Sequence, residues 1–217
     1  MNRLANRAPA LLRDPAFFRF WSGQTVSLFG DQVTLLALPL TAVLVLHAHA
    51  AQMGYLVAAE LAPNLLFSLH AGAWVDRRGN RRHVMIGTNL GRAALLTTIP
   101  VAYALGLLTL TQLYLVAFLV GTLSVFFFVS YSGFFVAVVP RERYVEGNSL
   151  LYGSRAFSFV AGPSVGGLLV QLLRAPFAIV ADAASFLVSG FSSGESLSPS
   201  PRQKKQREAT WLPACAT

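Results

Sequence analysis

Residues 72–82 read GAWVDRRGNRR and place five charged side chains and two glycines between two long apolar runs. So many charges in one short stretch stand out, because only 12% of the 217 residues are charged and 54% are hydrophobic. A soluble domain usually carries about 25% charged residues. The composition therefore predicts a protein whose main solvent is lipid, with its charges confined to the segments between apolar runs.

Six apolar runs can be marked along the chain, at about residues 20–46, 53–75, 84–107, 113–139, 148–173 and 176–191. In hydrocarbon, only helices and closed barrels satisfy every backbone hydrogen-bonding group. Barrel strands would be about 10 residues long with alternating polarity, whereas these runs are longer and apolar on all sides. The expected fold is an all-α integral membrane bundle of six transmembrane helices over residues 20–191.

The arginines predict how this bundle is oriented. Residues 1–19 contain four arginines and lack the apolar core of a cleavable signal peptide, so they are expected to form a cytoplasmic tail. The loop at 72–82 is also rich in arginine, whereas the connections at 47–52 and 108–112 contain no Lys or Arg. By the positive-inside rule, both termini and the 72–82 loop are cytoplasmic.

Other functional classes fit this pattern poorly. The net charge of +8 could suggest a nucleic-acid partner, but the basic residues lie between apolar runs instead of along one face. The single Cys215 excludes an intramolecular disulfide framework and a multi-cysteine metal cluster. His47 and His49 have no third ligand nearby, so no metal site is expected. No hydrolase, metalloprotease or phosphate-loop motif occurs, so neither an enzyme nor a cofactor is expected.

The 72–82 loop also carries a specific pattern, Gly-x-x-x-Asp-Arg-x-Gly-x-Arg, formed by Gly72, Asp76, Arg77, Gly79 and Arg81. It resembles the signature loop between the second and third helices of major facilitator superfamily transporters. We expect Gly72 to permit close helix approach, Gly79 to permit a tight turn, and Asp76 to accept backbone N–H groups at a helix N-terminus. The resemblance implies that the loop holds the two halves of a transporter together. The simpler alternative is that its arginines only set topology.

The fifth run contains a second motif, Gly162-Pro163-x-x-Gly166-Gly167. Ser154, Ser158, Gly162 and Gly166 recur every four residues and form one ridge of small side chains. The motif resembles the fifth-helix signature of the superfamily's exporters, in which Pro163 would kink the helix. Generic tight packing in a membrane bundle is the alternative explanation.

Residues 17–31 and 139–150 are similar to a bacterial branch that contains enterobactin exporters and macrolide efflux proteins. The resemblance implies a bacterial plasma-membrane transporter that exports small apolar or amphipathic compounds by proton antiport. Such transporters have two six-helix halves with the substrate between them, and this chain supplies one half. An Asp expected near Phe128 in many relatives is absent, which weakens any coupling scheme that depends on it.

Four ionisable residues inside the runs are candidates for transport or proton coupling, because such groups at membrane depth are rare and costly. Asp31 is expected near the middle of the first helix, where it could exchange a proton. Arg92 could pair with a buried acid or extend back to the cytoplasm. Glu60 and Asp182 are each expected below the outer end of a helix. For Asp31, the alternative is a structural role with hydrogen bonds from a neighbouring helix. Glu60 and Asp182 could each line an outward vestibule or cap a partner helix.

Residues 192–217 are polar and basic, and they follow a short sixth run. They are expected to be a disordered cytoplasmic tail or the product of a reading-frame change in a longer gene. Three possibilities follow for the chain: a truncated inactive product, a half-transporter that pairs with a second six-helix unit, or a non-transporting membrane protein. The expected partners are the lipid bilayer, a small-molecule substrate and a second six-helix half.

Overall fold

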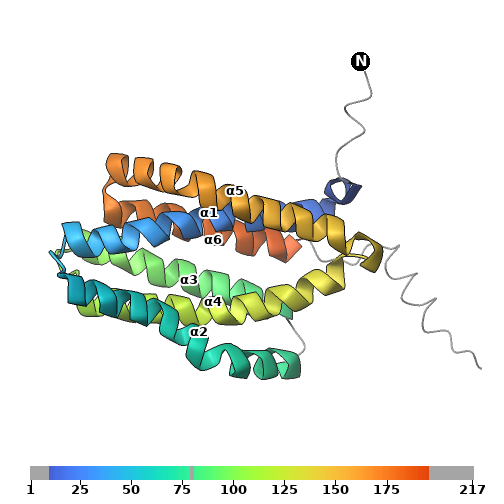
Figure 1. The fold of residues 1–217 in the computed structure, drawn as a ribbon, viewed down its shortest axis with the longest axis horizontal. Coiled ribbons are helices and arrows are strands. Elements are labelled where there is room, and N and C mark those ends of the chain that lie inside the picture. Colours follow the sequence, from blue (N-terminus) through green and yellow to red (C-terminus); the bar gives the residue numbers. More distant parts are fainter. Residues whose placement is uncertain (1–9, 79–80, 196–217) are drawn as a thin grey trace, which may run out of the picture.

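A computed structural model describes residues 10–78 and 81–195. The described residues form six long helices, which run alongside one another (Figure 1), and a short 3-10 helix η2 (Ala10–Arg13) comes before the first. The helices are α1 (Pro15–Leu44), α2 (Ala50–Arg78), α3 (Arg81–Ala104), α4 (Leu110–Val138), α5 (Tyr144–Leu173) and α6 (Ala175–Glu195), and the 3-10 helix η3 (Arg141–Arg143) precedes α5. The predicted all-helical bundle is thus confirmed.

Most helix ends extend a few residues beyond the predicted apolar runs. The start of α1 at Pro15 includes residues expected in the N-terminal tail. The sixth helix reaches Glu195, four residues beyond the end of the predicted apolar run. Hydrogen bonding can continue through polar residues such as Ser192 and Ser193 where apolar composition no longer signals a helix. The rest of the predicted tail, residues 196–217, lies outside the described residues.

Five of the described helices, α1 to α5, are long and apolar enough to cross a membrane. The apolar part of α6 is shorter and covers Ala175–Leu187. This matches the short sixth run seen in the sequence. The family resemblance and these spans agree on a bundle that sits within a bilayer.

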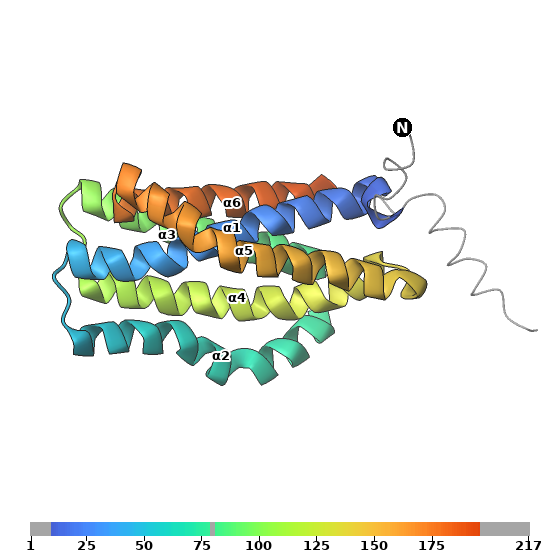
Figure 2. The same ribbon diagram turned by 45° about the horizontal axis from the view of Figure 1, so that its top comes forward.

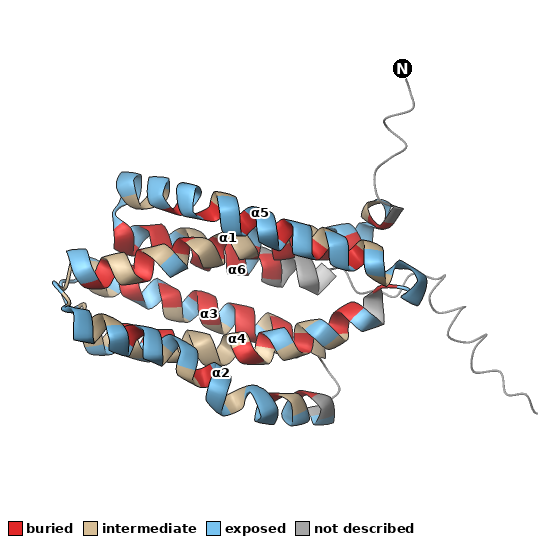
Figure 3. Cartoon of the chain, in the orientation of Figure 1, coloured by how far each residue is buried: buried red, intermediate tan, exposed pale blue. Residues whose placement is uncertain are grey.

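The helices pack in a definite order: α1 contacts α5 and α6, α3 contacts α6 and α4, and α2 packs mainly on α4. Figure 3 shows buried residues on the inner faces of the helices, whereas α2 and α5 expose much of their surface. The helices α2 and α5 therefore lie at the two ends of this packing order and have the most uncovered surface.

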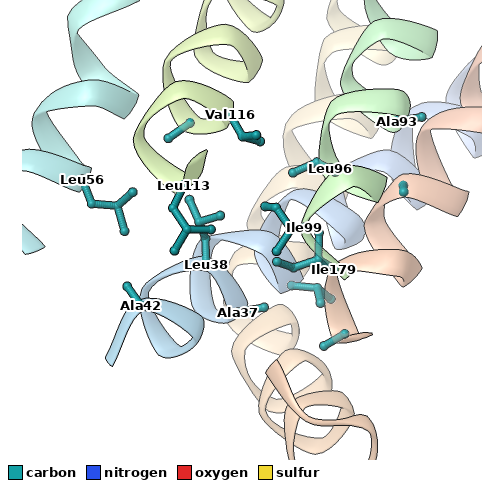
Figure 4. Close-up of a cluster of buried hydrophobic side chains, with 14 of the residues drawn as sticks. Ala37, Leu38, Ala42, Leu56, Ala93, Leu96, Ile99, Leu113, Val116 and Ile179 are labelled. Carbon is teal, nitrogen blue, oxygen red and sulfur yellow. The ribbon is translucent and has the colours of Figure 1, made fainter. Parts of the chain in front are cut away.

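The buried apolar side chains form two clusters, one toward each end of the bundle. The outer-end cluster contains Val33, Ala37, Leu38, Leu96, Ile99, Leu113, Ile179, Phe186 and their neighbours, many of which Figure 4 shows. The cytoplasmic-end cluster, named for the orientation that the arginines predict, contains Leu11, Phe17, Phe20, Met85, Phe127, Phe134, Phe135, Val139 and Leu151. The layer between the two clusters holds buried polar and charged residues, including Arg92 and Asp182.

Helix α2 bends partway along its length, as Figure 2 shows. Pro63 lies inside this helix, where its missing N–H and its ring can kink the backbone. Gly121 of α4 allows close contact at this level: a Cβ there would be 2.8 Å from the carbonyl oxygen of Glu60 and 3.1 Å from Pro63 Cγ. The first half of α2 is therefore held tightly against α4.

Candidate functional site

A cavity of about 690 Å³ lies among the six helices and receives side chains from all of them. Its walls are mostly Leu, Val, Ala and Phe. Its polar lining residues are Asp31, Gln32, Thr34, Glu60, Asn64, Ser68, Arg92, Ser124, Arg155, Ser158 and Asp182. All four candidate residues therefore line one cavity, which the sequence alone could not establish.

Arg92 of α3 is the centre of the polar layer. Its side chain is only 2% exposed, and its Nη1 lies 4.0 Å from Asp31 Oδ1 of α1. Nη1 also donates a hydrogen bond to Ser124 Oγ of α4 at 3.3 Å. Of the two expectations for Arg92, the structure shows a side chain held inside the bundle near an acid instead of one extended toward the cytoplasm.

The other contacts of Arg92 fix its plane. Its Nη2 donates to Asn89 Oδ1, and Asn89 Nδ2 in turn donates to Ser189 Oγ at 3.2 Å. The guanidinium carbon lies 4.6 Å from the ring centre of Phe127 and 4.0 Å from that of Phe186, within the range of cation–π attraction. Phe127 and Phe186 belong to different apolar clusters, so Arg92 is sandwiched between the two.

Asp182 of α6 is fully buried, and hydroxyl groups satisfy both of its carboxylate oxygens. Thr34 Oγ1 donates to Oδ2 at 2.5 Å, and Ser185 Oγ lies 3.1 Å from Oδ1 as a donor. Gly30 of α1 makes this contact possible, because a Cβ at residue 30 would overlap Ser185 Oγ and Asp182 Oδ1. The carboxyl group is thus held by one hydroxyl from the neighbouring helix α1 and one from α6 itself.

Asp31 has a different environment from Asp182. It lies near the middle of α1, as expected, and its side chain is 38% exposed to the cavity. Glu60 lines the same cavity from α2, and Arg155 lines it from α5. Glu146, near the start of α5, accepts a hydrogen bond from the Leu11 N–H. The cavity thus contains three acids and two arginines, and both Asp31 and Asp182 interact with the buried Arg92.

Comparison with known proteins now identifies the family. A family model described as Major Facilitator Superfamily matches residues 20–214. The chain belongs to the Major Facilitator Superfamily. Multidrug resistance protein 2 of Bacillus subtilis is 30% identical over 138 residues, which is 61% of this chain and 32% of the relative. Multidrug resistance protein 1 of the same organism is 29% identical over 147 residues, 65% of this chain and 36% of the relative.

The chain spans about a third of the length of these curated relatives. No solved structure matches it significantly. The superfamily consists of membrane transporters, which agrees with the spans found in the bundle. The six-helix fold corresponds to the N-terminal half predicted from the sequence.

The superfamily's loop motif is only partly described here. The Asp76 side chain and Gly79 lie outside the described residues. The close approach expected at Gly72 is not found, since a Cβ there would meet nothing within 4 Å among the described atoms. The reason is that α2 packs little against α3. Arg81, in contrast, lays its guanidinium across Gly133 of α4, where a Cβ would overlap it.

The fifth-helix motif has the predicted ridge geometry. Ser154, Ser158, Gly162 and Gly166 are all buried, and they face α1. A Cβ at Gly162 would be 2.5 Å from Gln32 Cβ, and one at Gly166 would be 3.2 Å from Leu36 Cδ1. Gly167 has open space around it, and Pro163 is exposed within the helix. Half of the motif therefore serves α1–α5 packing, and the other half faces outward.

The aromatic residues of α4 divide between the apolar cluster and the cavity. Phe127, Phe134 and Phe135 pack in the cytoplasmic-end cluster. Phe128 is 45% exposed and lines the cavity. The sequence did not single out Gln32, Asn89 or Ser124, because neutral polar residues in apolar helices are common and only their spatial convergence distinguishes them.

Proposed function

We propose that this chain forms one half of a drug-efflux transporter that exports small apolar or amphipathic compounds in exchange for protons. The observation that carries the proposal is the 690 Å³ cavity with the Arg92–Asp31 pair in its wall. Ligand pockets for drug-sized compounds have about 300–1,000 Å³, and this cavity falls in that range, with apolar walls and eleven polar residues in its lining. The names of both Bacillus subtilis relatives support efflux of drugs.

In the proposed cycle, Asp31 exchanges the proton. It is open to the cavity, whereas Asp182 is fully buried. Proton binding at Asp31 would cancel its attraction to Arg92 across the 4.0 Å that separates them. Arg92 contacts α1, α3, α4 and α6 through its neighbours, so a change in this pair can alter the packing of several helices at once. If substrate and proton displace each other in the cavity, substrate binding would alter the same Arg92–Asp31 pair, and transport of the two would be coupled.

A second six-helix unit would complete the pathway. The cavity carries exposed polar side chains from the outlying helices, including Glu60, Asn64 and Arg155. Polar groups that face hydrocarbon are costly, so these residues need a protein or water-filled surface opposite them. Transporters built from two repeats hold substrate at the interface between them. The proposed partner is therefore a second six-helix half that covers the cavity.

The test uses a pump-deficient bacterial host that expresses this chain alone or together with a second six-helix half. We expect pH-driven drug efflux only when both halves are present. In the complete transporter, Asp31→Asn should abolish the dependence of efflux on the proton gradient. Glu142→Gln, which alters an exposed acid in η3, is the matched control and should retain it.

Three results would contradict parts of the proposal. Unchanged proton-driven efflux in Asp31→Asn would remove Asp31 from the coupling scheme. Efflux by the 217-residue chain alone would show that a second half of different sequence is unnecessary. An absence of efflux even from the complete assembly would favour the alternative that the protein does not transport.

A further inference from the structure

A second cavity, of about 470 Å³, lies between the cytoplasmic halves of α2, α3 and α4. Its lining residues are Trp74, His83, Val84, Gly87, Thr88, Leu123 and Phe126. Residues two apart on a helix point about 160° away from each other. Leu123 and Phe126 each lie two residues from a residue that lines the central cavity, Gly121 and Phe128. The second cavity therefore lies on the other side of α4 from the proposed transport pathway.

This second cavity is a largely apolar groove. The Trp74 ring meets the Phe126 ring edge-on, with 5.3 Å between their centres. Gly87 leaves the groove open, because a Cβ there would meet nothing within 4 Å among the described atoms. The groove exists because α2 packs on α4 and has few contacts with α3 beyond the Pro63 bend. Its shape and lining suit a hydrocarbon chain.

One cationic side chain, Arg77, and the ring of His83 lie at the end of the groove. His83 lines it and is exposed, and Arg77 lies one turn beyond Trp74 on the same side of α2. By the positive-inside rule this is the cytoplasmic end, where the membrane surface carries anionic lipids. Trp at the interface and basic pockets between transmembrane helices are the features that recognise such lipids.

We propose that this groove binds an anionic phospholipid of the cytoplasmic leaflet. One acyl chain lies against Trp74, Leu123 and Phe126, and the phosphate lies near Arg77 and His83. Charge complementarity favours this ligand over a neutral lipid. The position of the groove, on the side of α4 away from the central cavity, favours lipid over the second six-helix half. The proposal does not depend on drug efflux and can be tested on the isolated chain.

The test measures quenching of Trp74 fluorescence by phospholipids that carry bromine on their acyl chains. The chain has three tryptophans, so Trp21→Phe and Trp211→Phe leave Trp74 as the only emitter. The protein is placed in phosphatidylcholine vesicles that contain a small fraction of brominated phosphatidylglycerol or, separately, brominated phosphatidylcholine. One basic residue near an anionic lipid surface changes lipid preference by about fivefold. We expect brominated phosphatidylglycerol to be preferred by at least about this factor.

Two variants test the two parts of the site. Arg77→Gln should reduce the preference for phosphatidylglycerol by about fivefold, whereas Arg141→Gln, at an exposed arginine of η3, should leave it unchanged. Gly87→Leu should fill the groove and remove the preferential quenching. Gly153→Leu is its control, because Gly153 on α5 is also exposed with open space around it.

Equal quenching by the two brominated lipids would overturn the proposal, and so would a preference that survives both Arg77→Gln and Gly87→Leu. Shielding of Trp74 from both lipids would show that another protein segment fills the groove, which overturns the proposal as well.

Trp21 donates a hydrogen bond to the Leu150 carbonyl, so its replacement could impair folding. Native mass spectrometry of the unaltered chain gives an independent readout: retained phosphatidylglycerol should exceed phosphatidylcholine, and Gly87→Leu should lose it.

Discussion

Two glycines on α5 allow a sharp test of how this bundle is packed. Gly162 faces α1, where an added Cβ would be 2.5 Å from Gln32 Cβ and 2.6 Å from its Cγ. Gly167 is five residues further along the same helix, and a Cβ there would meet nothing within 4 Å of the described atoms. The substitutions Gly162→Ala and Gly167→Ala therefore make the same chemical change in opposite environments.

The expected magnitudes follow from the two environments. A methyl group forced into a well-packed contact costs about 1–3 kcal/mol. Alanine in place of glycine inside a helix contributes about 0.5–1 kcal/mol of stability. The Cβ of Gln32 is fixed to the α1 backbone, so it cannot move away without the helix. We expect Gly162→Ala to lose about 1–2 kcal/mol of unfolding free energy, and Gly167→Ala to gain about 0.5 kcal/mol or to stay unchanged.

The assay is thermal unfolding of the detergent-solubilised chain, followed by circular dichroism and by retention of the monodisperse peak in size-exclusion chromatography. For a chain of this size, 1 kcal/mol corresponds to about 2–4 °C in Tm. Gly162→Ala should therefore lower Tm by about 2–8 °C relative to the unaltered chain and by about 2–10 °C relative to Gly167→Ala. Equal Tm values for the two variants would refute the inferred contact between α5 and α1 at Gln32.

Two further substitutions test the polar layer and the loop. Arg92→Leu should cost about 1–3 kcal/mol of unfolding free energy, because Asn89 Oδ1 loses its donor and the Asp31 carboxylate loses its counter-charge. In thermal unfolding, the double variant with Asp31→Asn should recover part of the lost Tm. Equal Tm values for Arg92→Leu and the double variant would contradict the pairing. Gly133→Ala should displace the Arg81 guanidinium that lies across it. Trypsin cleavage after Arg81, mapped by mass spectrometry, should then become faster, whereas Gly153→Ala should leave it unchanged.

The sequence predicted the helices well because their signal is local. Each run is apolar on all sides and long enough to span hydrocarbon, and this depends on composition alone. The ridge on α5 could also be predicted, since a four-residue repeat of small side chains sets one face whatever the partner. The identity of that partner, α1, required the structure.

The parts that could not be predicted depend on contacts between distant segments. Arg92 had two plausible directions, toward an acid or toward the cytoplasm, and its partners on α1, α4 and α6 decide between them. The role of Gly72 depended on whether α2 and α3 meet at that point, and the bend at Pro63 works against this. The pair Gly30–Asp31 was one sequence signal of this layer: a glycine next to an acid in the middle of a helix indicates that another helix packs closely at a polar position, here α6.

The same layer gives its two aspartates opposite environments, and this difference supports separate roles for them. Asp182 is fully buried with hydroxyl donors to both oxygens, and Gly30 keeps α1 close enough for Thr34 to reach it. Asp31 is open to the cavity and has Arg92 at 4.0 Å. Both aspartates line the cavity, but a buried and hydrogen-bonded carboxyl group holds helices together, whereas the 38% exposed side chain of Asp31 is the better candidate for proton exchange. Replacement of Asp182 should therefore lower the thermal stability of the protein. Replacement of Asp31 should leave the protein folded and reduce the coupling of efflux to the proton gradient.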